Sequence, residues 1–460
     1  MRRALRLTLP LGLALFVLAT LAVGRARGGD AVPPTTDAEA GRRHILETPY
    51  VPPALDQEVA DNLWRVWTEP LRSQAEALDA EARRALVFRH YGLDPRPDDA
   101  SGRPLQMVVT PEGAWHMSCF TCHGGHVAGQ VLPGLPNAHL ALQSLVDDVA
   151  KTKRLLGRKL APGDLAASFL PFGETVGTTN AVVFSISLLR LRDEDLNVVP
   201  PKGIPRLPHH DLDAPPWWHL KRRKHLYIDG FAKPNHRALM QFLLVPQNGR
   251  DAVLAAEDDF RDIEAYVRSI EAPRWPFAVD AEKAARGRIV FEAACADCHG
   301  TYGEGGSYPE KLVPIDVIGT DRVRLDALTV DDRTTYSTSW LTEYDPSGVR
   351  TDPGGYVAPP LDGIWASAPY FHNGSAPTLW HVLHPEQRPA AWRRDPVLYD
   401  EQRVGLRVEE AAAPPATQSP DERRRWFDTT KRGKSAAGHD FPAALDETQR
   451  SDLLEYLKTL

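Results

Sequence analysis

Two short stretches decide how this chain folds: Cys119-Phe120-Thr121-Cys122-His123 and Cys295-Ala296-Asp297-Cys298-His299. Each holds two cysteines separated by two residues and followed at once by a histidine, and together they use all 4 cysteines of the chain. Two thiols at this spacing can add across the two vinyl groups of one haem, and the adjoining imidazole can bind the iron. We therefore predict two covalently attached c-type haems. The predicted thioether cysteines are Cys119, Cys122, Cys295 and Cys298, and the predicted proximal iron ligands are His123 and His299.

Paired cysteines at this spacing are also typical of structural zinc sites. A zinc site would not explain why a histidine directly follows each pair. Nor would it account for the export signal at the start of the chain. The haem interpretation is therefore preferred.

The N-terminus has the features of an export signal. Arg2, Arg3 and Arg6 precede residues 7–23, which contain no charged side chain. We predict that residues 1–28 are a signal peptide. The alternative is an N-terminal anchor that is never removed, since the apolar run is near the lower limit for spanning a bilayer. Both interpretations place the rest of the chain in the periplasm or otherwise outside the cytoplasm, and the second adds a membrane tether.

Composition and periodicity predict a mainly α fold with long loops. The chain has 40 prolines and 33 glycines, which favours modest helices joined by ordered loops. A helical pattern runs from Asp280 into the second motif, and Leu453, Tyr456 and Leu457 repeat at helical spacing near the C-terminus. Strand signals are sparse, with one short candidate at 107–110. Residues 31–45 are predicted to be a polar leader.

Two cytochrome c-type haem domains are predicted, one around each motif. Pro273 and Pro276 form a natural boundary. The N-terminal haem domain is accordingly placed at residues 40–275 and the C-terminal cytochrome c domain at 276–460. The net charge of −7 argues against nucleic acid as a partner, because nucleic acid would require a basic surface.

The ligand opposite each proximal histidine decides the chemistry, because axial ligands set the haem potential and an open position binds oxygen species. Methionines occur only at positions 1, 107, 117 and 240, so none from the C-terminal domain can cap the second haem. The histidines available there are His372, His381, His384 and His439. A haem with two histidine ligands has a lower potential than one with His and Met. Any one of these histidines could instead be a hydrogen-bonded loop or surface residue.

Several short segments in both halves of the chain carry a resemblance to a known family. In the second half they are Ala358-Pro359-Pro360-Leu361-Asp362-Gly363-Ile364-Trp365, Ala368-Pro369-Tyr370-Phe371-His372-Asn373-Gly374-Ser375, Pro377-Thr378-Leu379 and the closing residues 454–460. In the first half they are Thr178-Thr179-Asn180-Ala181 and Tyr227-Ile228-Asp229-Gly230. With these segments the chain resembles bacterial di-haem cytochrome c peroxidases, strongly in the second half and loosely in the first. Within that superfamily the rubber oxygenases and their relatives look nearer, because Phe427-Asp428-Thr429 and Ala437-Gly438-His439 are similar to their tail.

The resemblance implies further ligands. Peroxidases bring the distal ligand of the second haem from the segment before the last helix, which here makes His439 the first candidate and His372 the second. His139 is the candidate distal ligand of the first haem, because it follows Gly134-Leu135 at a place comparable to the family's distal loop. The family also holds a calcium ion between its domains. Asn180 with the backbone oxygens of Ser367 and Pro369 would match that site, and calcium prefers such hard oxygen ligands.

The chain departs from the peroxidase pattern in its distal pocket. Peroxidases carry a Gln and a Glu there for acid–base work on peroxide, whereas the matching stretch here offers only Gln241. Residues 242–245 around it are apolar, which suits an apolar substrate or dioxygen, although they could simply be the inner face of a core helix. The position of the family's inter-haem tryptophan is Ile228.

Three functions follow from these observations. The first is a peroxidase-type enzyme, in which electrons from a donor protein enter at the C-terminal haem and hydrogen peroxide is reduced at the N-terminal haem. The second is a dioxygenase like the rubber oxygenases, acting on an apolar substrate with dioxygen. The third is a non-catalytic electron-transfer cytochrome with both irons capped. The first is preferred, and an enzyme is favoured over a carrier.

Overall fold

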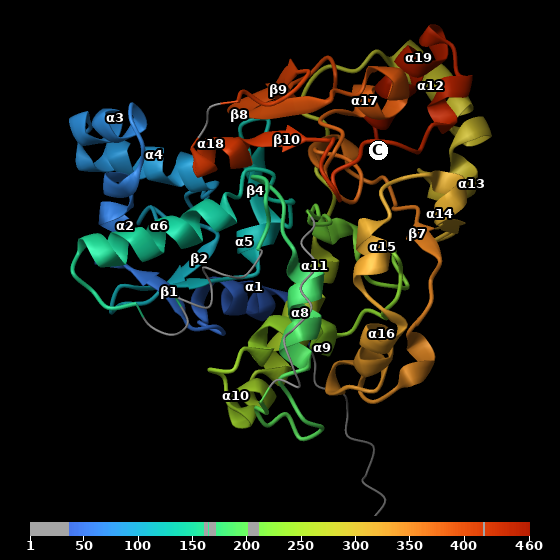
Figure 1. Ribbon diagram of the computed structural model, residues 1–460. Helices are drawn as coiled ribbons and strands as arrows, with labels where there is room; N and C mark the ends of the chain where they lie inside the picture. Colours follow the sequence, from blue (N-terminus) through green and yellow to red (C-terminus); the bar gives the residue numbers. More distant parts are fainter. Residues whose placement is uncertain (1–35, 161–163, 165–171, 201–210, 417–418) are drawn as a thin grey trace, which may run out of the picture. The chain divides into compact units, whose positions relative to one another are not determined.

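Helices and mostly short antiparallel strands make up the computed structural model, which describes residues 36–160, 164, 172–200, 211–416 and 419–460 (Figure 1). The predicted signal peptide or anchor, residues 1–28, lies outside these residues. No helix in the described part of the chain is both long and apolar enough to cross a membrane.

The elements before the second motif are as follows. The helices are α1 (Ala38–Glu47), α2 (Gln57–Asn62), α3 (Leu71–Ala77), α4 (Ala80–Tyr91), α5 (Phe120–His123), α6 (Leu142–Leu155), α8 (Ala181–Leu189), α9 (His236–Leu239), α10 (Arg250–Ala255), α11 (Glu257–Ser269) and α12 (Ala281–Ala294). The strands are β1 (Pro53–Asp56), β2 (Met107–Val109), β3 (Ala114–Met117), β4 (Gly124–Val127) and β5 (Gln130–Pro133).

The elements from the second motif onward complete the fold. The helices are α13 (Ala296–His299), α14 (Ile315–Ile318), α15 (Val323–Ala327), α16 (Val330–Ser337), α17 (Leu379–Leu383), α18 (Pro420–Arg425) and α19 (Glu447–Leu457). The strands are β6 (Leu312–Pro314), β7 (Gly355–Val357), β8 (Ala391–Asp400), β9 (Gly405–Ala411) and β10 (Trp426–Asp428).

The fold is mixed rather than purely α, which corrects the prediction of a mainly α chain. Four small antiparallel sheets lie among the helices of the described residues, with strand orders β1-β3-β2, β10-β8-β9, β4-β5 and β6-β7. The candidate strand at 107–110 is confirmed as β2. The other strands were not predicted because most are three or four residues long, too short to show a period of two.

Helix α1 shows that the prediction of a polar leader over 31–45 was wrong for the residues that the structure describes. The Asp37 carboxylate caps α1 by accepting hydrogen bonds from the N–H groups of Glu39 and Ala40, at 2.9 and 3.1 Å. The helix packs against α11, and Gly41 lies so close to the backbone of Asp262 that any Cβ would overlap it. Helix α1 is therefore part of the packed fold.

The helix before the second motif and the closing helix, both predicted from the sequence, pack against each other. Helices α12 and α19 lie side by side (Figure 1), and Gly287 permits their close approach because a Cβ there would overlap the Asp452 carbonyl. Arg286 donates from Nε and Nη2 to the two carboxylate oxygens of Asp452, both at 2.7 Å. The predicted apolar face of α19 is buried.

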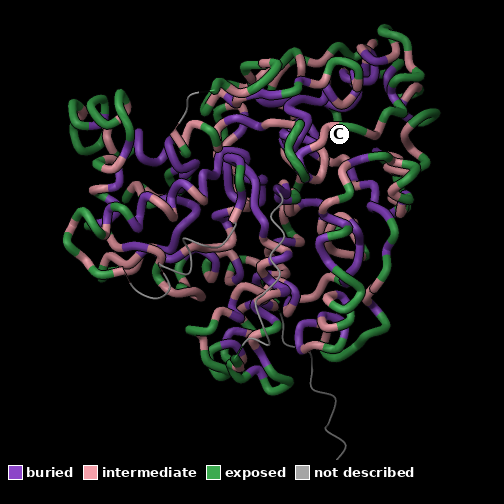
Figure 2. The backbone as a smooth tube through the Cα atoms, in the orientation of Figure 1, coloured by how far each residue is buried: buried purple, intermediate pink, exposed green. Residues whose placement is uncertain are grey.

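Three hydrophobic clusters form the core, and two of them mix early and late parts of the chain. One joins α8 and α11 to Tyr336 and Trp340. Another joins Leu135 and Trp218 to α12, α19 and β8. The third lies among α2, α4 and α6. Helices α3 and α10 are largely exposed (Figure 2).

Candidate haem-binding sites

The first motif forms a single helical turn between two sheets. Strand β3 leads into it, Cys119 precedes α5, and the hairpin β4–β5 follows His123 directly. The N–H of His123 donates to the Cys119 carbonyl at 3.2 Å, which closes the turn. The turn brings the two thiols and the imidazole to one end of a short element, as attachment of one haem requires.

The His123 imidazole is oriented from outside the motif. Its Nδ1 lies 3.0 Å from the backbone oxygen of Pro215, and the Trp217 ring packs on it at 5.1 Å between centroids. A carbonyl oxygen can only accept, so Nδ1 carries the proton and Nε2 keeps its lone pair for a metal. Burial lowers the pKa of His123 to about 4, which keeps the ring in the neutral form that binds iron.

The second motif repeats this construction. Helix α12 ends at the motif, and Cys295, α13 and His299 form the turn. The His299 Nδ1 donates to the backbone oxygen of Pro359 at 2.9 Å, and burial lowers the pKa of His299. Both motifs therefore have half-buried free thiols beside a neutral imidazole whose Nε2 is available. This donor set fits a covalently bound haem.

The structure brings His439 to His299. Their ring centroids are 6.1 Å apart at an interplanar angle of 68°. Metal–imidazole bonds are about 2.0 to 2.1 Å long, so two rings on one metal atom have centroids roughly 6 Å apart. His439 Nδ1 is buried and has no hydrogen-bond partner within the described residues. Burial, followed by the charges of His299 and Arg388, lowers the pKa of His439 to about 3.

Arg388 holds the backbone that carries His439. Its Nη1 donates to the carbonyls of Ala436 and Gly438, both at 2.6 Å, and its guanidinium lies 4.8 Å from the Phe371 ring centroid. The His439 N–H donates to the Ile318 carbonyl at 2.7 Å. These contacts hold His439 in the left-handed region, at φ 52°, which a non-glycine residue adopts only under such constraint.

The other two histidine candidates each pack against another ring. His372 packs against Tyr356, with ring centroids 4.6 Å apart. His139 is buried and stacks on His126 at 4.3 Å with an interplanar angle of 6°. His126 is in turn hydrogen-bonded to Asp94 at 2.8 Å. The structure thus pairs His139 with His126 and His372 with Tyr356.

The predicted calcium residues are buried at the ends of local elements. Asn180 precedes α8, and Ser367 and Pro369 follow the turn at Ile364. No cluster of three or more His, Cys, Asp or Glu side chains within the described ranges could hold a metal ion. Calcium, which here would rely on an amide and backbone oxygens, stays a prediction.

The side-chain amide of Gln241 already makes one hydrogen bond through its oxygen. The Tyr227 hydroxyl donates to Gln241 Oε1 at 3.0 Å, which leaves the amide NH₂ as the available group. Leu243 and Leu244 beside it are buried in the core. For Leu243 and Leu244 this confirms the simpler interpretation, that they face the hydrophobic core.

One segment connects the surroundings of the two proximal histidines. Pro215 accepts the hydrogen bond of His123, and three residues later Trp218 Nε1 donates to the Asp362 carbonyl at 2.7 Å. Asp362 lies three residues after Pro359, which accepts from His299. The role of neither proline was predicted from the sequence. The tripeptide Ala-Pro-Pro marks both sites, at 214–216 and 358–360, but it also occurs at 413–415, after β9.

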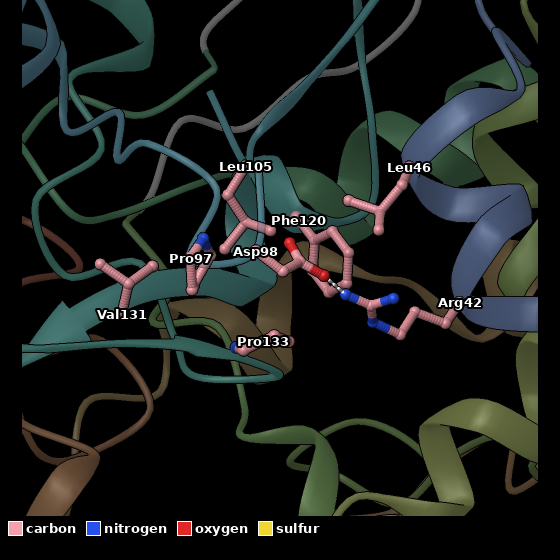
Figure 3. Close-up of a pocket in the computed structure, with 8 residues that line it drawn as sticks. All are labelled: Arg42, Leu46, Pro97, Asp98, Leu105, Phe120, Val131 and Pro133. Atoms are coloured by element: carbon pink, nitrogen blue, oxygen red, sulfur yellow. Dashed lines mark hydrogen bonds and ion pairs between the residues drawn. The ribbon is translucent and has the colours of Figure 1, made fainter. Parts of the chain in front are cut away.

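An apolar cavity of about 210 Å³ adjoins the first motif at Phe120. Its apolar lining residues are Leu46, Pro97, Leu105, Phe120, Val131 and Pro133. Figure 3 shows the Arg42 guanidinium reaching the Asp98 carboxylate, and this ion pair is the charged part of the lining.

Comparison with known proteins gives a match in the second half. Residues 355–393 match the family model described as "RoxA-like, cytochrome c-like". Two relatives come from Sinorhizobium fredii (strain NBRC 101917 / NGR234). "Uncharacterized protein y4iM" is 33% identical over 233 residues, which cover 42% of this chain and 52% of the relative. "Uncharacterized protein y4iJ" is 26% identical over 258 residues, which cover 42% of this chain and 41% of the relative. The chain spans about half the length of the curated relatives it matches.

These findings support a relationship to the cytochrome c family. The matched stretch includes Pro359, which orients His299, and His372. A c-type cytochrome with covalently bound haem c and a redox role is therefore supported.

Proposed function

We propose that the chain is an exported di-haem c-type cytochrome of the peroxidase type. It takes electrons from a donor protein at the haem of the second motif and reduces hydrogen peroxide at the haem of the first motif. The observation that carries this proposal is a difference between the two motifs. His439 faces His299 at 6.1 Å, whereas the ring packed on His123 in the described part of the chain is Trp217, which has no lone pair for a metal.

This difference supports separate roles for the two motifs. A haem with an imidazole on each side keeps its ligands through electron transfer, while a haem with one protein ligand keeps a position for a small oxidant. When bound, the haem supplies the redox chemistry. The chain's own residues orient and tune it. Pro215 and Pro359 fix the proximal imidazoles through Nδ1, and such hydrogen bonds raise the basicity of the ligand.

Gln241 has a limited role in this proposal. An amide does not titrate, so it cannot act as a general acid or base. With Oε1 engaged by Tyr227, its NH₂ group can only donate a hydrogen bond to a bound oxygen atom. A positioning role is therefore assigned to Gln241, in place of the acid–base work that the peroxidases perform with a Gln and a Glu.

A dioxygenase is the second candidate, and one observation favours it. The cavity beside Phe120 is lined mainly by apolar side chains and adjoins the first motif. Such a cavity accepts dioxygen or a small apolar group more readily than it accepts peroxide, because it offers few hydrogen-bond partners.

The deciding experiment is electron paramagnetic resonance on the purified protein, oxidised and after one-electron reduction, followed by assays of turnover. We expect one low-spin haem, one haem that is high-spin or becomes so on half-reduction, and steady peroxide reduction with an electron donor. Cys119→Ala/Cys122→Ala and Cys295→Ala/Cys298→Ala should each lower the haem-to-protein ratio from two to one and abolish turnover. Two low-spin haems without peroxide turnover would indicate an electron carrier. Dioxygen uptake with an unsaturated hydrocarbon, without peroxide turnover, would indicate the dioxygenase.

A further inference from the structure

A second cavity, of about 400 Å³, lies beside the β8–β9 hairpin and is rich in arginine. Its arginines are Arg89, Arg393, Arg394, Arg407 and Arg425, and its acidic residues are Asp395 and Glu409. Val176, Pro396 and Val408 add apolar surface, and His139 also lines it. Such a volume lies within the range of small-molecule sites, which is about 300 to 1,000 Å³.

Arg394 is the unusual member of this lining. It is 7% exposed, and its Nη1 donates to the Ala138 carbonyl. Its Nε and Nη2 have no hydrogen-bond partner among the residues described. Buried guanidinium groups are normally fully paired, because an unsatisfied charged donor away from water is costly. The two open donors therefore point to an acceptor that the described residues do not supply.

The acidic groups near Arg394 do not fill this role. Asp213 and Asp211 act on Arg394 electrostatically, but no hydrogen bond joins either carboxylate to it. Asp211 lies 3.1 Å from Lys434 instead. Burial raises the pKa of Asp213 well above its ordinary value against the effect of the Arg394 charge, and Asp213 Oδ1 has no hydrogen-bond partner among the described residues. Asp395 is engaged by the N–H groups of Val397 and Leu398, both at 2.8 Å.

The remaining arginines fall into two groups. Arg393 is paired with Glu409 at 2.6 Å and Arg425 with Asp421 at 3.0 Å, so their charges are largely balanced. The side chains of Arg89 and Arg407 are exposed and make no ion pair or hydrogen bond to a described residue. The cavity thus combines one buried donor group with two uncompensated charges at a rim that solvent reaches.

We propose that this cavity binds a carboxylate, with the open Nε and Nη2 donors of Arg394 as its anchor. Guanidinium and carboxylate match each other in a two-point hydrogen-bonded geometry. Arg89 and Arg407 suit a second negative charge, and the apolar residues suit a short hydrocarbon body, so the ligand class is a small organic dicarboxylic acid. The same chemistry could come from a propionate of a bound haem. The exposed rim favours the free acid.

The test is calorimetric titration of the haem-loaded protein with adipate, a six-carbon dicarboxylate. Replacing Arg394 by Gln should weaken binding roughly tenfold or more, since it removes a charge-assisted pair. Arg393→Gln is the matched control, because Arg393 lines the same cavity but is already paired with Glu409. Its effect should stay below roughly threefold. Arg407→Gln, at an exposed position, should weaken binding and keeps the test decisive if Arg394→Gln fails to fold.

The two sources of the carboxylate give different results. Adipate binding that is lost in Arg394→Gln and retained in Arg393→Gln supports the free acid. Absence of adipate binding, together with a shifted haem spectrum and reduction potential in Arg394→Gln at unchanged haem content, supports a propionate. Absence of both effects, or equal weakening by the two variants, overturns the proposal. None of these measurements depends on turnover, so they stand apart from the proposed peroxidase activity.

Discussion

The imidazoles of His299 and His439 face each other with their ring centroids 6.1 Å apart, although the two residues lie near opposite ends of the second half of the chain. The separation leaves room for a single metal atom bound by both rings. Pro359 orients the first imidazole from behind, and Arg388 holds the loop that carries the second. The surrounding protein thus fixes both rings independently of each other.

Replacing His439 by Ala should therefore change the second haem alone. We expect one low-spin signal to disappear from the electron paramagnetic resonance spectrum, or to be replaced by that of another ligand, and the potential of that haem to rise. His372→Ala is the control, because His372 packs on Tyr356 rather than facing His299. Unchanged spectra and potentials in His439→Ala, or equal changes in both variants, would contradict the assignment.

Gly438 offers a way to move His439 without removing any ligand atom. Gly438 has φ 81°, and a Cβ there would overlap the backbone of Gly319 and Thr320. Gly438→Ala should cost roughly 2 to 4 kcal/mol of stability and convert part of the second haem to a high-spin form. Thermal unfolding and the haem spectrum measure the two effects.

Gly305→Ala is the matched control for Gly438. Gly305 also has a positive φ, 74°, but no atom lies within 4 Å of the added Cβ. It should cost only about 1 to 2 kcal/mol, from the backbone conformation alone, and leave the haem spectrum unchanged. If the two variants behaved alike, close packing at Gly438 would not position His439.

The third prediction concerns the buried charged cluster of Asp229, Arg324 and Arg333. Its carboxylate accepts hydrogen bonds from Arg324 at 3.3 Å and from Arg333 at 2.8 Å, and all three residues are almost fully buried. Asp229→Asn leaves two guanidinium groups without a counter-charge and should destabilise the fold by about 3 to 5 kcal/mol. Asp326→Asn, on an exposed pair with Arg322, should cost less than about 1 kcal/mol. Similar melting temperatures for the two variants would contradict this account.

Local pattern was enough to predict the elements around the second motif. The helix entering it and the closing helix are confirmed as α12 and α19, because apolar spacing reports directly on which face is buried. The proximity of His439 to His299 came from resemblance alone, since it depends on how distant segments pack. Pro215 and Pro359 were missed because they act through backbone carbonyls, which any residue possesses.

The hairpin of β8 and β9 was missed for a different reason. In a half-buried strand the inward positions are normally apolar, and this alternation is the main sequence signal. In β8 an inward position is occupied by Arg394, which is buried beside Trp392. A charged residue at such a position is normally interpreted as exposed. Arg394, which lines the cavity, therefore also removed the sequence signal that would have predicted the hairpin.

The ion pair between Lys434 and Asp211 makes the stability of the fold depend on pH. Lys434 is 4% exposed, and its ammonium lies 3.1 Å from Asp211. Burial opposes ionisation of Asp211, but the Lys434 charge together with hydrogen bonds from the Glu174 N–H and the hydroxyls of Thr175 and Thr178 more than offsets it and holds the pKa of this carboxyl below its ordinary value. A carboxyl of this kind stabilises the fold above its unfolded pKa of about 4, and that stability is lost as the pH falls through the folded pKa. Burial also disfavours the charged form of Lys434, but Asp211 and Glu174 together more than offset this, and the pKa of Lys434 is raised. The contribution of Lys434 to stability therefore persists up to about pH 10.

Replacing Lys434 by Met should reverse this dependence at the acid end. At pH 7.5 the variant buries an unpaired Asp211 carboxylate and should be less stable by about 3 to 5 kcal/mol. At pH 4.5 that carboxyl is largely protonated in the variant, so the difference from the natural chain should shrink to less than half. Urea unfolding at both pH values measures this. Lys431→Met, at an exposed residue 3.9 Å from Asp428, should change stability by less than about 1 kcal/mol at either pH. A deficit in Lys434→Met that is equal at pH 7.5 and pH 4.5 would mean that packing of the lysine stem, rather than the charge pair, stabilises this part of the fold.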